Sequence, residues 1–293
     1  MNNLKGTIIK NESNIYTVIT EKGKYNAIPR GKFKNQDIVP VVGDRVKLSI
    51  ENDIAIIEEI MPRNVYIKRP KLANITQIVF VQSSKNPKPD LLLLDKQLAF
   101  AEYLKVKSLI ILNKIDLDKN KEFKKIKEIY EEIGYKVIET QANENIGIDK
   151  LKNELKGNIS AFAGNSGVGK STLINRLFNN NITLEGEISQ KNKKGKNTTT
   201  TIQIYEIEKN AYIADTPGFS TLDISEIQSK DLDKYFIEFK KYIKNCEFIG
   251  CTHIKEENCG VKQAVENEKI SKDRYNRFCK IYEELKEKEK RKW

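Results

Sequence analysis

Two short motifs appear along this chain in an order that limits the folds it can adopt. Residues 113–116 read NKID, and residues 164–171 read GNSGVGKS. In most chains that carry both motifs the glycine-rich one opens the domain, whereas here it comes second. A compact domain whose natural ends lie close together can be reconnected and cut elsewhere without altering its sheet. The order therefore predicts an α/β domain in which the strands keep their places while the connectivity is permuted.

The glycine-rich motif lies between an apolar strand pattern at residues 159–163 and a helical pattern at residues 171–178. This is the context that a phosphate-binding loop requires, because its glycines let the backbone approach the phosphates and the helix N-terminus faces them. Lys170 is expected to contact the β- and γ-phosphates, and the Ser171 hydroxyl to ligate magnesium. The predicted nucleotide-binding residues of this loop are Gly164, Asn165, Ser166, Gly167, Val168, Gly169, Lys170, Ser171 and Thr172.

A second phosphate-side motif, DTPG at residues 215–218, follows another strand pattern. Asp215 is expected to hold magnesium directly or through water, and Gly218 to offer its amide to the γ-phosphate. Read alone, the same four residues also suit an ordinary turn. Residues 190–201, QKNKKGKNTTTT, suggest a mobile switch in which Thr199 or a neighbour completes the magnesium shell; a solvated basic loop is the alternative.

The NKID motif also ends a strand pattern and is expected to select the base. A carboxylate at Asp116 can accept from both N1–H and the exocyclic amine of guanine, and adenine offers no such donor pair. The predicted nucleotide is therefore GTP. Asn113 is expected to orient the base, the Lys114 stem to lie along its ring, and Ile115 to belong to the same loop. Residues 140–143, TQAN, are expected to contact the base mainly through the backbone.

The segments on either side of this domain predict two further domains. Residues 1–70 alternate apolar and polar side chains over four or five short strands, which is the size of a small barrel such as an OB-fold. Residues 71–223 alternate strands with helices and predict the α/β domain with a mostly parallel sheet. Residues 224–293 are expected to be helical around a group of cysteines and to end in a charged helix.

Three of the four cysteines gather at Cys246, Cys251 and Cys259, together with His253, the only histidine of the chain. No apolar run is long enough to cross a membrane and the first 20 residues lack a signal-peptide core, so a cytoplasmic location is expected. In that compartment clustered cysteines indicate metal rather than disulfides. Three thiolates and one imidazole form a closed tetrahedral set and predict structural zinc, with a chance grouping as the alternative. Cys279 is expected to be a packed or idle thiol.

The chain is basic, with a formal net charge of +11. Residues 1–71 contain 13 Lys and Arg but only 8 Asp and Glu. This balance favours an acidic partner such as nucleic acid. A lysine-rich proteome accounts for the same charge equally well.

The motif order resembles that of the circularly permuted GTPases, and together with the flanking domains the whole chain is similar to the RsgA family of ribosome small-subunit-dependent GTPases. The resemblance implies hydrolysis of GTP during late maturation of the small (30S) subunit, binding of its rRNA, stimulation by the subunit and departure after hydrolysis. It also implies contact with other maturation factors and a Cys, Cys, His, Cys zinc site at the positions named above. A monomer without membrane association is expected.

Two positions depart from the usual pattern. Phe219 stands where many GTPases place a water-orienting glutamine, and Asn197 stands where family members tend to have histidine. The free protein therefore lacks an evident group for the attacking water. Two other functions stay open: an RNA-binding assembly scaffold whose nucleotide site does not turn over, and a GTPase that acts on a non-ribosomal partner such as a tRNA.

Overall fold

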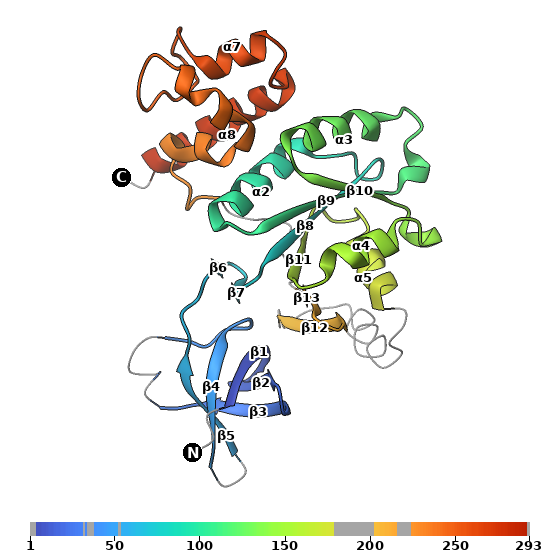
Figure 1. Cartoon of the computed structure of the whole chain (residues 1–293), viewed down its shortest axis with the longest axis vertical. Coiled ribbons are helices and arrows are strands. Elements are labelled where there is room, and N and C mark those ends of the chain that lie inside the picture. Colours follow the sequence, from blue (N-terminus) through green and yellow to red (C-terminus); the bar gives the residue numbers. More distant parts are fainter. Residues whose placement is uncertain are drawn as a thin grey trace. The chain divides into compact units, whose positions relative to one another are not determined.

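The computed structural model of the chain describes residues 4–31, 33, 38–51, 54–178, 202–215 and 224–291 (Figure 1). These residues divide into two compact units. One contains Met1–Val79, Ala142–Ala163 and Lys170–Ser220, and the other contains Phe80–Gln141, Gly164–Gly169 and Thr221–Trp293. Within the described ranges, no helix combines the length and the apolar composition that a bilayer crossing requires.

Five strands of the first unit close into a barrel, as the alternating pattern predicted. They are β1 (Leu4–Glu12), β2 (Ile15–Thr20), β3 (Gly23–Pro29), β4 (Arg45–Glu51) and β5 (Ile54–Ile60). The pairings run β1 to β2 to β3 to β5 to β4 and back to β1, with only β3 and β5 parallel. Inward side chains such as Ile8, Val18 and Leu48 are buried and form the core. This closed five-stranded arrangement confirms the predicted small barrel of the OB type.

A short hairpin follows the barrel, with β6 at Tyr66–Lys68 and β7 at Lys71–Ala73. Gly43 must be a glycine for this hairpin to dock, because its φ is +90° and an added Cβ would lie 1.9 Å from the Ala73 carbonyl oxygen. The predicted domain boundary at residue 70 lies between these two strands. The boundaries at 70 and 223 stay predictions.

The first unit also contains three strands that come after the NKID motif in the chain. β11 (Ile159–Ala163) pairs in parallel with β13 (Ala211–Asp215), and β12 (Gln203–Glu208) pairs antiparallel with β13. The helices of this part, α4 (Ile148–Leu155) and α5 (Lys170–Phe178), bury one apolar face each, formed in α4 by Ile148, Leu151 and Leu155. The 3-10 turn η2 spans Ala142–Glu144. β12 also meets β1 of the barrel, where Lys10 lies opposite Gln203.

The second unit contains the strands and helices that come earlier in the chain. β9 (Lys107–Asn113) and β10 (Lys136–Thr140) pair in parallel, and their last residues, Asn113 and Thr140, lie opposite each other. β8 (Gln77–Ser83) is divided between the units and is buried along its whole length. α2 (Leu91–Leu104), η1 (Ile115–Leu117) and α3 (Glu122–Ile133) complete this part.

The C-terminal part of the second unit is helical, as predicted. It comprises the 3-10 turns η3 (Ser229–Tyr235), η4 (Ile237–Lys241) and η5 (Ile243–Asn245), and the helices α7 (Gly260–Glu266) and α8 (Lys272–Lys290). Its core is aromatic, because Phe236, Phe239 and Phe278 pack with ring centroids 4.8 to 5.4 Å apart. The sequence indicated only the charged end of the last helix. In the structure α8 begins earlier, at Lys272, and its first half contributes Phe278 to this core.

Candidate nucleotide-binding site and metal centre

The glycine-rich loop comes directly after β11 and leads directly into α5, so its strand and helix flanks are those that its sequence predicted. Two glycines are required by close contacts. Gly164 has φ +140° and an added Cβ would lie 2.3 Å from the Val81 carbonyl oxygen; Gly169 has φ +100° and an added Cβ would lie 2.3 Å from Asn113 Nδ2. A side chain at either position would push the loop away from the neighbouring strand end.

Asn113 connects the two motifs. Its side-chain Nδ2 donates to the Val168 carbonyl oxygen at 3.0 Å, and its Oδ1 accepts from the Thr140 hydroxyl at 3.0 Å. The residue is 2% exposed. The sequence predicted a base-orienting amide, whereas both of these bonds run to protein groups of the phosphate loop and of β10. The expected base contact of Asn113 stays a prediction. Sequence reasoning gave the Thr140 side chain no role, although its place at a strand end was a usable signal.

Lys114 connects the phosphate loop to the segment between β8 and α2. Its backbone is left-handed, with φ +62°, and its Nζ donates to the carbonyl oxygens of Gly167 at 2.7 Å and Asn86 at 2.6 Å. Ser84 Oγ in turn donates to the Lys114 carbonyl oxygen at 2.7 Å. The side chain is therefore extended across the loop, which leaves its methylene stem available to a planar base. Ser84 and Asn86 were missed because a backbone carbonyl partner leaves no trace in a sequence pattern.

The remaining residues of the base motif lie in η1, directly after Lys114. Asp116 is exposed and Ile115 is half-buried. An exposed carboxylate at the end of a parallel strand is accessible to a ligand at that edge.

On the phosphate side, Lys170 opens α5 and is half-buried. Burial lowers the pKa of its ammonium below the ordinary value, and an anion beside it would offset that effect. Ser171 is exposed and Thr172 is half-buried. Asn165 of the loop donates from Nδ2 to Asp90 Oδ2 at 3.3 Å, Val168 is buried and Ser166 is exposed.

Asp215 is the last residue of β13. Because β13 is parallel to β11, with Ala214 opposite Ala161, Asp215 lies at the same strand ends from which the glycine-rich loop departs. That is where a second magnesium-binding group is expected. The other predicted switch residues, Thr199 and Gly218, and the departures Asn197 and Phe219, lie outside the described residues.

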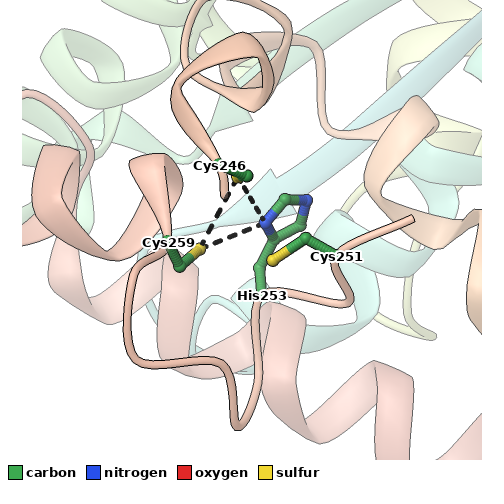
Figure 2. A group of neighbouring side chains, drawn as sticks. All are labelled: Cys246, Cys251, His253 and Cys259. Atoms are coloured by element: carbon green, nitrogen blue, oxygen red, sulfur yellow. Dashed lines mark hydrogen bonds between the residues drawn. The ribbon is translucent and has the colours of Figure 1, made fainter. Parts of the chain in front are cut away.

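The predicted metal ligands come together in the C-terminal part of the second unit. Figure 2 shows the sulfur atoms of Cys246, Cys251 and Cys259 facing His253 Nδ1, and the four ligand atoms all lie within 4.8 Å of one another. Cys246 Sγ is 3.6 Å from His253 Nδ1 and 4.0 Å from Cys259 Sγ. Bond lengths of about 2.3 Å to sulfur and about 2.0 Å to nitrogen give ligand separations of roughly 3.5 to 3.8 Å in a tetrahedral zinc site. The four residues therefore fit zinc.

Local contacts hold the loop that supplies these ligands. Glu256 accepts from the backbone N–H groups of Thr252 at 2.8 Å and Ile254 at 3.0 Å, and from the Thr252 hydroxyl at 2.8 Å. Burial raises the pKa of the Glu256 carboxyl, but these donors outweigh it and lower the pKa to about 2. Tyr275 of α8 donates to the His253 carbonyl oxygen at 2.6 Å.

The far side of the imidazole and the thiols have the environment of a metal site. Asp233 Oδ2 lies 3.6 Å from His253 Nε2, the side on which a carboxylate commonly orients a metal-bound histidine. Burial, together with the two neighbouring thiols, raises the pKa of Cys251 to about 12. A bound cation would reverse that shift. Cys279 lies outside the cluster and is half-buried.

Comparison with protein families gives two matches that together cover most of the chain. A model described as RsgA N-terminal domain matches residues 5–56, and one described as RsgA GTPase matches residues 60–225. The small ribosomal subunit biogenesis GTPase RsgA of Clostridium novyi (strain NT) is 43% identical over 291 residues, which are 99% of this chain and 100% of the relative. The protein of that name from Caldanaerobacter subterraneus subsp. tengcongensis is 38% identical over 295 residues, covering 100% and 99% of the two chains.

Two solved structures share the fold along nearly the whole chain. YjeQ from Thermotoga maritima superposes with a TM-score of 0.85 at 35% identity, covering 97% of this chain and 98% of that one. YloQ, described as a circularly permuted GTPase, gives a TM-score of 0.83 at 30% identity, covering 98% and 96%. The permuted connectivity predicted from the motif order is confirmed.

Proposed function

This chain belongs to the RsgA GTPase family, and from that membership we propose that it hydrolyses GTP to GDP and phosphate as an assembly factor of the small ribosomal subunit. The observation that carries the proposal is the junction at Asn113. One buried amide ties the phosphate loop at Val168 to the β10 end at Thr140, so the motifs of a permuted chain meet as one nucleotide site requires.

In this site the base is held by the NKID segment. Asp116 accepts from N1–H and the exocyclic amine of guanine, and the extended Lys114 stem lies along the ring. Lys114 and Asn113 also fix the phosphate loop by their bonds to Gly167 and Val168. The distance between base and phosphates is thereby set before the nucleotide arrives, which reduces the ordering that binding requires.

The phosphates are held by the backbone of residues 164–169 and by Lys170, whose charge the β- and γ-phosphates stabilise. Ser171 and Asp215 would hold magnesium, and Thr199, which lies outside the described residues, would complete the set when the γ-phosphate is present. Magnesium, when bound, neutralises charge that develops on the phosphates. Gly218 offers its amide to the γ-phosphate.

The Cys246, Cys251, His253 and Cys259 site is structural. Four protein ligands leave no open position, so zinc there contributes folding free energy rather than chemistry. The basic barrel and the zinc-stabilised C-terminal part contact the subunit and its rRNA, and the protein leaves after hydrolysis. By family membership it also assists the release of other maturation factors, and it acts as a cytoplasmic monomer.

The test combines binding and turnover on the same protein preparations. Lys170→Ala and Ser171→Ala are each expected to reduce GTP hydrolysis by at least about 100-fold, the size of losing one group that stabilises transition-state charge. Co-sedimentation with purified small subunits, measured against tRNA competitor, identifies the partner. Unchanged turnover in both variants would refute the phosphate-loop assignment, and preference for tRNA would favour the non-ribosomal alternative. Nucleotide binding without any hydrolysis would favour the scaffold.

A further inference from the structure

One carboxylate connects the phosphate loop to the start of α2. Asp90 is the N-cap of this helix, and its Oδ1 accepts from the Leu93 backbone N–H at 2.9 Å. Its second oxygen, Oδ2, accepts from Asn165 Nδ2 of the phosphate loop at 3.3 Å. Gln82 Oε1 accepts from the Asp90 backbone N–H at 3.0 Å and holds the residue in place. The first turn of α2 is therefore tied directly to the loop that surrounds the phosphates.

The next turn of the same helix is fastened to the C-terminal part of the chain. Asp95 is fully buried and accepts from Tyr130 Oη at 2.5 Å, from Arg277 Nε at 2.5 Å and from Arg274 Nη1. Arg274 is 1% exposed and also donates to Glu238 Oε1 at 2.5 Å. Figure 1 shows α8, which carries both arginines, beside α2.

The electrostatics of this cluster make it resistant to separation. Burial alone would lower the pKa of Arg274, but Asp95 and Glu238 outweigh it and raise the pKa above the ordinary value. Burial and the Asp95 carboxylate raise the pKa of Tyr130 well above its usual range, so the phenol stays a donor. Removing one partner of a buried ion pair leaves an uncompensated charge without water around it, which is strongly unfavourable. α8 is therefore expected to follow α2 when α2 moves.

Asp90 and Asp95 lie five residues apart, which is about 7.5 Å along an α-helix. A displacement of the phosphate loop that shifts Asp90 thus reaches the buried arginine cluster through little more than one helical turn. Lys96 adds an exposed ion pair to Glu284 of α8 at 2.5 Å, one residue beyond Asp95.

We propose that α2 couples the phosphate loop to α8. Asp90 contacts the phosphate loop through Asn165, and Asp95 binds Arg274 and Arg277 of α8, so a shift of the loop displaces α8 through α2. Nucleotide occupancy and docking of the C-terminal part on α2 are then thermodynamically linked, and each must affect the other by the same factor. The inference rests on the proposed nucleotide site.

The experiment measures amide hydrogen exchange of α8 in the full-length protein with and without saturating GDP. GDP is expected to slow exchange of α8 amides in the wild type by on the order of 5-fold, the lower end of common coupling factors. Asp90→Asn keeps a side-chain oxygen for the Leu93 cap but turns an NH2 group toward the NH2 of Asn165. This variant is expected to bind GDP and to lose the α8 response.

The matched control is Asp118→Asn. Asp118 also holds the start of a helix, because its two oxygens accept from the backbone N–H groups of Glu122 at 3.0 Å and Phe123 at 3.1 Å, although the N-cap of α3 is Lys121. It is expected to keep the full α8 response. A loss in both variants would mean that helix stability, not the contact to Asn165, carries the effect, and would overturn the proposal.

Reciprocity supplies a second readout. Arg277→Met removes one donor to Asp95 at a position that is 14% exposed by side chain, while Arg274 keeps the carboxylate paired. The GDP dissociation constant is expected to rise by roughly the same 5-fold, and by no further factor in the Asp90→Asn background. Binding of GDP with unchanged α8 exchange, or independent effects of the two substitutions, would refute the coupling through α2 but not the nucleotide site. Failure of the wild type to bind GDP would refute the nucleotide site itself.

Discussion

Asn113 is buried and uses both ends of its amide, donating to Val168 and accepting from Thr140. Asn113→Ala leaves both partners without this bond, and each unsatisfied buried group costs about 1 to 3 kcal/mol. The free energy of unfolding is therefore expected to fall by roughly 2 to 6 kcal/mol, and GDP affinity to fall with it. Urea unfolding and fluorescent-nucleotide titration measure the two effects. Thr140→Val, which removes one bond, is the control with a smaller loss; wild-type values for Asn113→Ala would contradict the assignment.

At the same scale, Asp116 is the residue that we propose selects the base. Asp116→Asn is expected to weaken GTP binding and to favour xanthosine triphosphate, because the amide cannot accept twice from guanine but can donate to the xanthine carbonyl. A bidentate contact discriminates by about 1 to 3 kcal/mol, or roughly 5- to 150-fold in relative affinity. Competition between the two triphosphates measures the ratio. A variant that kept the wild-type guanine preference would show that NKID does not bind the base.

At the scale of elements, hydrophobic periodicity predicted four or five short strands over residues 1–70 and a strand at residues 159–163, and the structure has the five barrel strands β1 to β5 and the strand β11 there. β3 carries a weak signal in the sequence because its segment, GKYNAIP, buries only Ala27 fully and so lacks a clear alternation. The contacts around the site were less accessible. Asn86 and Gly167 accept through their carbonyl oxygens, and Asp95 meets Arg274 across 179 positions of sequence. Neither main-chain acceptors nor long-range pairs leave a local pattern.

The cysteine and histidine cluster is an element whose stability is expected to depend on metal. The purified protein should contain about one zinc per chain, because metal binding and folding of such a loop are coupled. Cys251→Ser is expected to lose the metal and unfold the C-terminal part while nucleotide binding is largely kept. Metal analysis under reducing conditions and limited proteolysis measure both effects. Cys279→Ser, at the cysteine outside the cluster, should retain the zinc; clearly less than one equivalent in the wild type would contradict the structural site.

At the scale of the whole molecule, the basic segment ahead of the switch threonines is expected to be ordered by rRNA phosphates. Replacing Lys191, Lys193, Lys194 and Lys196 with alanine should then abolish stimulation by the small subunit and leave the basal turnover nearly unchanged. Turnover is measured at low and high salt with a fixed amount of subunit. Equal stimulation of mutant and wild type at low salt would rule out this ordering mechanism.

We expect this permuted site to hydrolyse GTP slowly by itself and rapidly on the small subunit, since Phe219 cannot orient water, Asn197 is no base and the only histidine belongs to the metal cluster. The direct measurement is GTP turnover by the full chain alone, with purified large subunits and with purified small subunits. We expect small subunits to accelerate the turnover and large subunits to leave it unchanged. Rapid hydrolysis by the free protein, or equal rates in all three conditions, would contradict it.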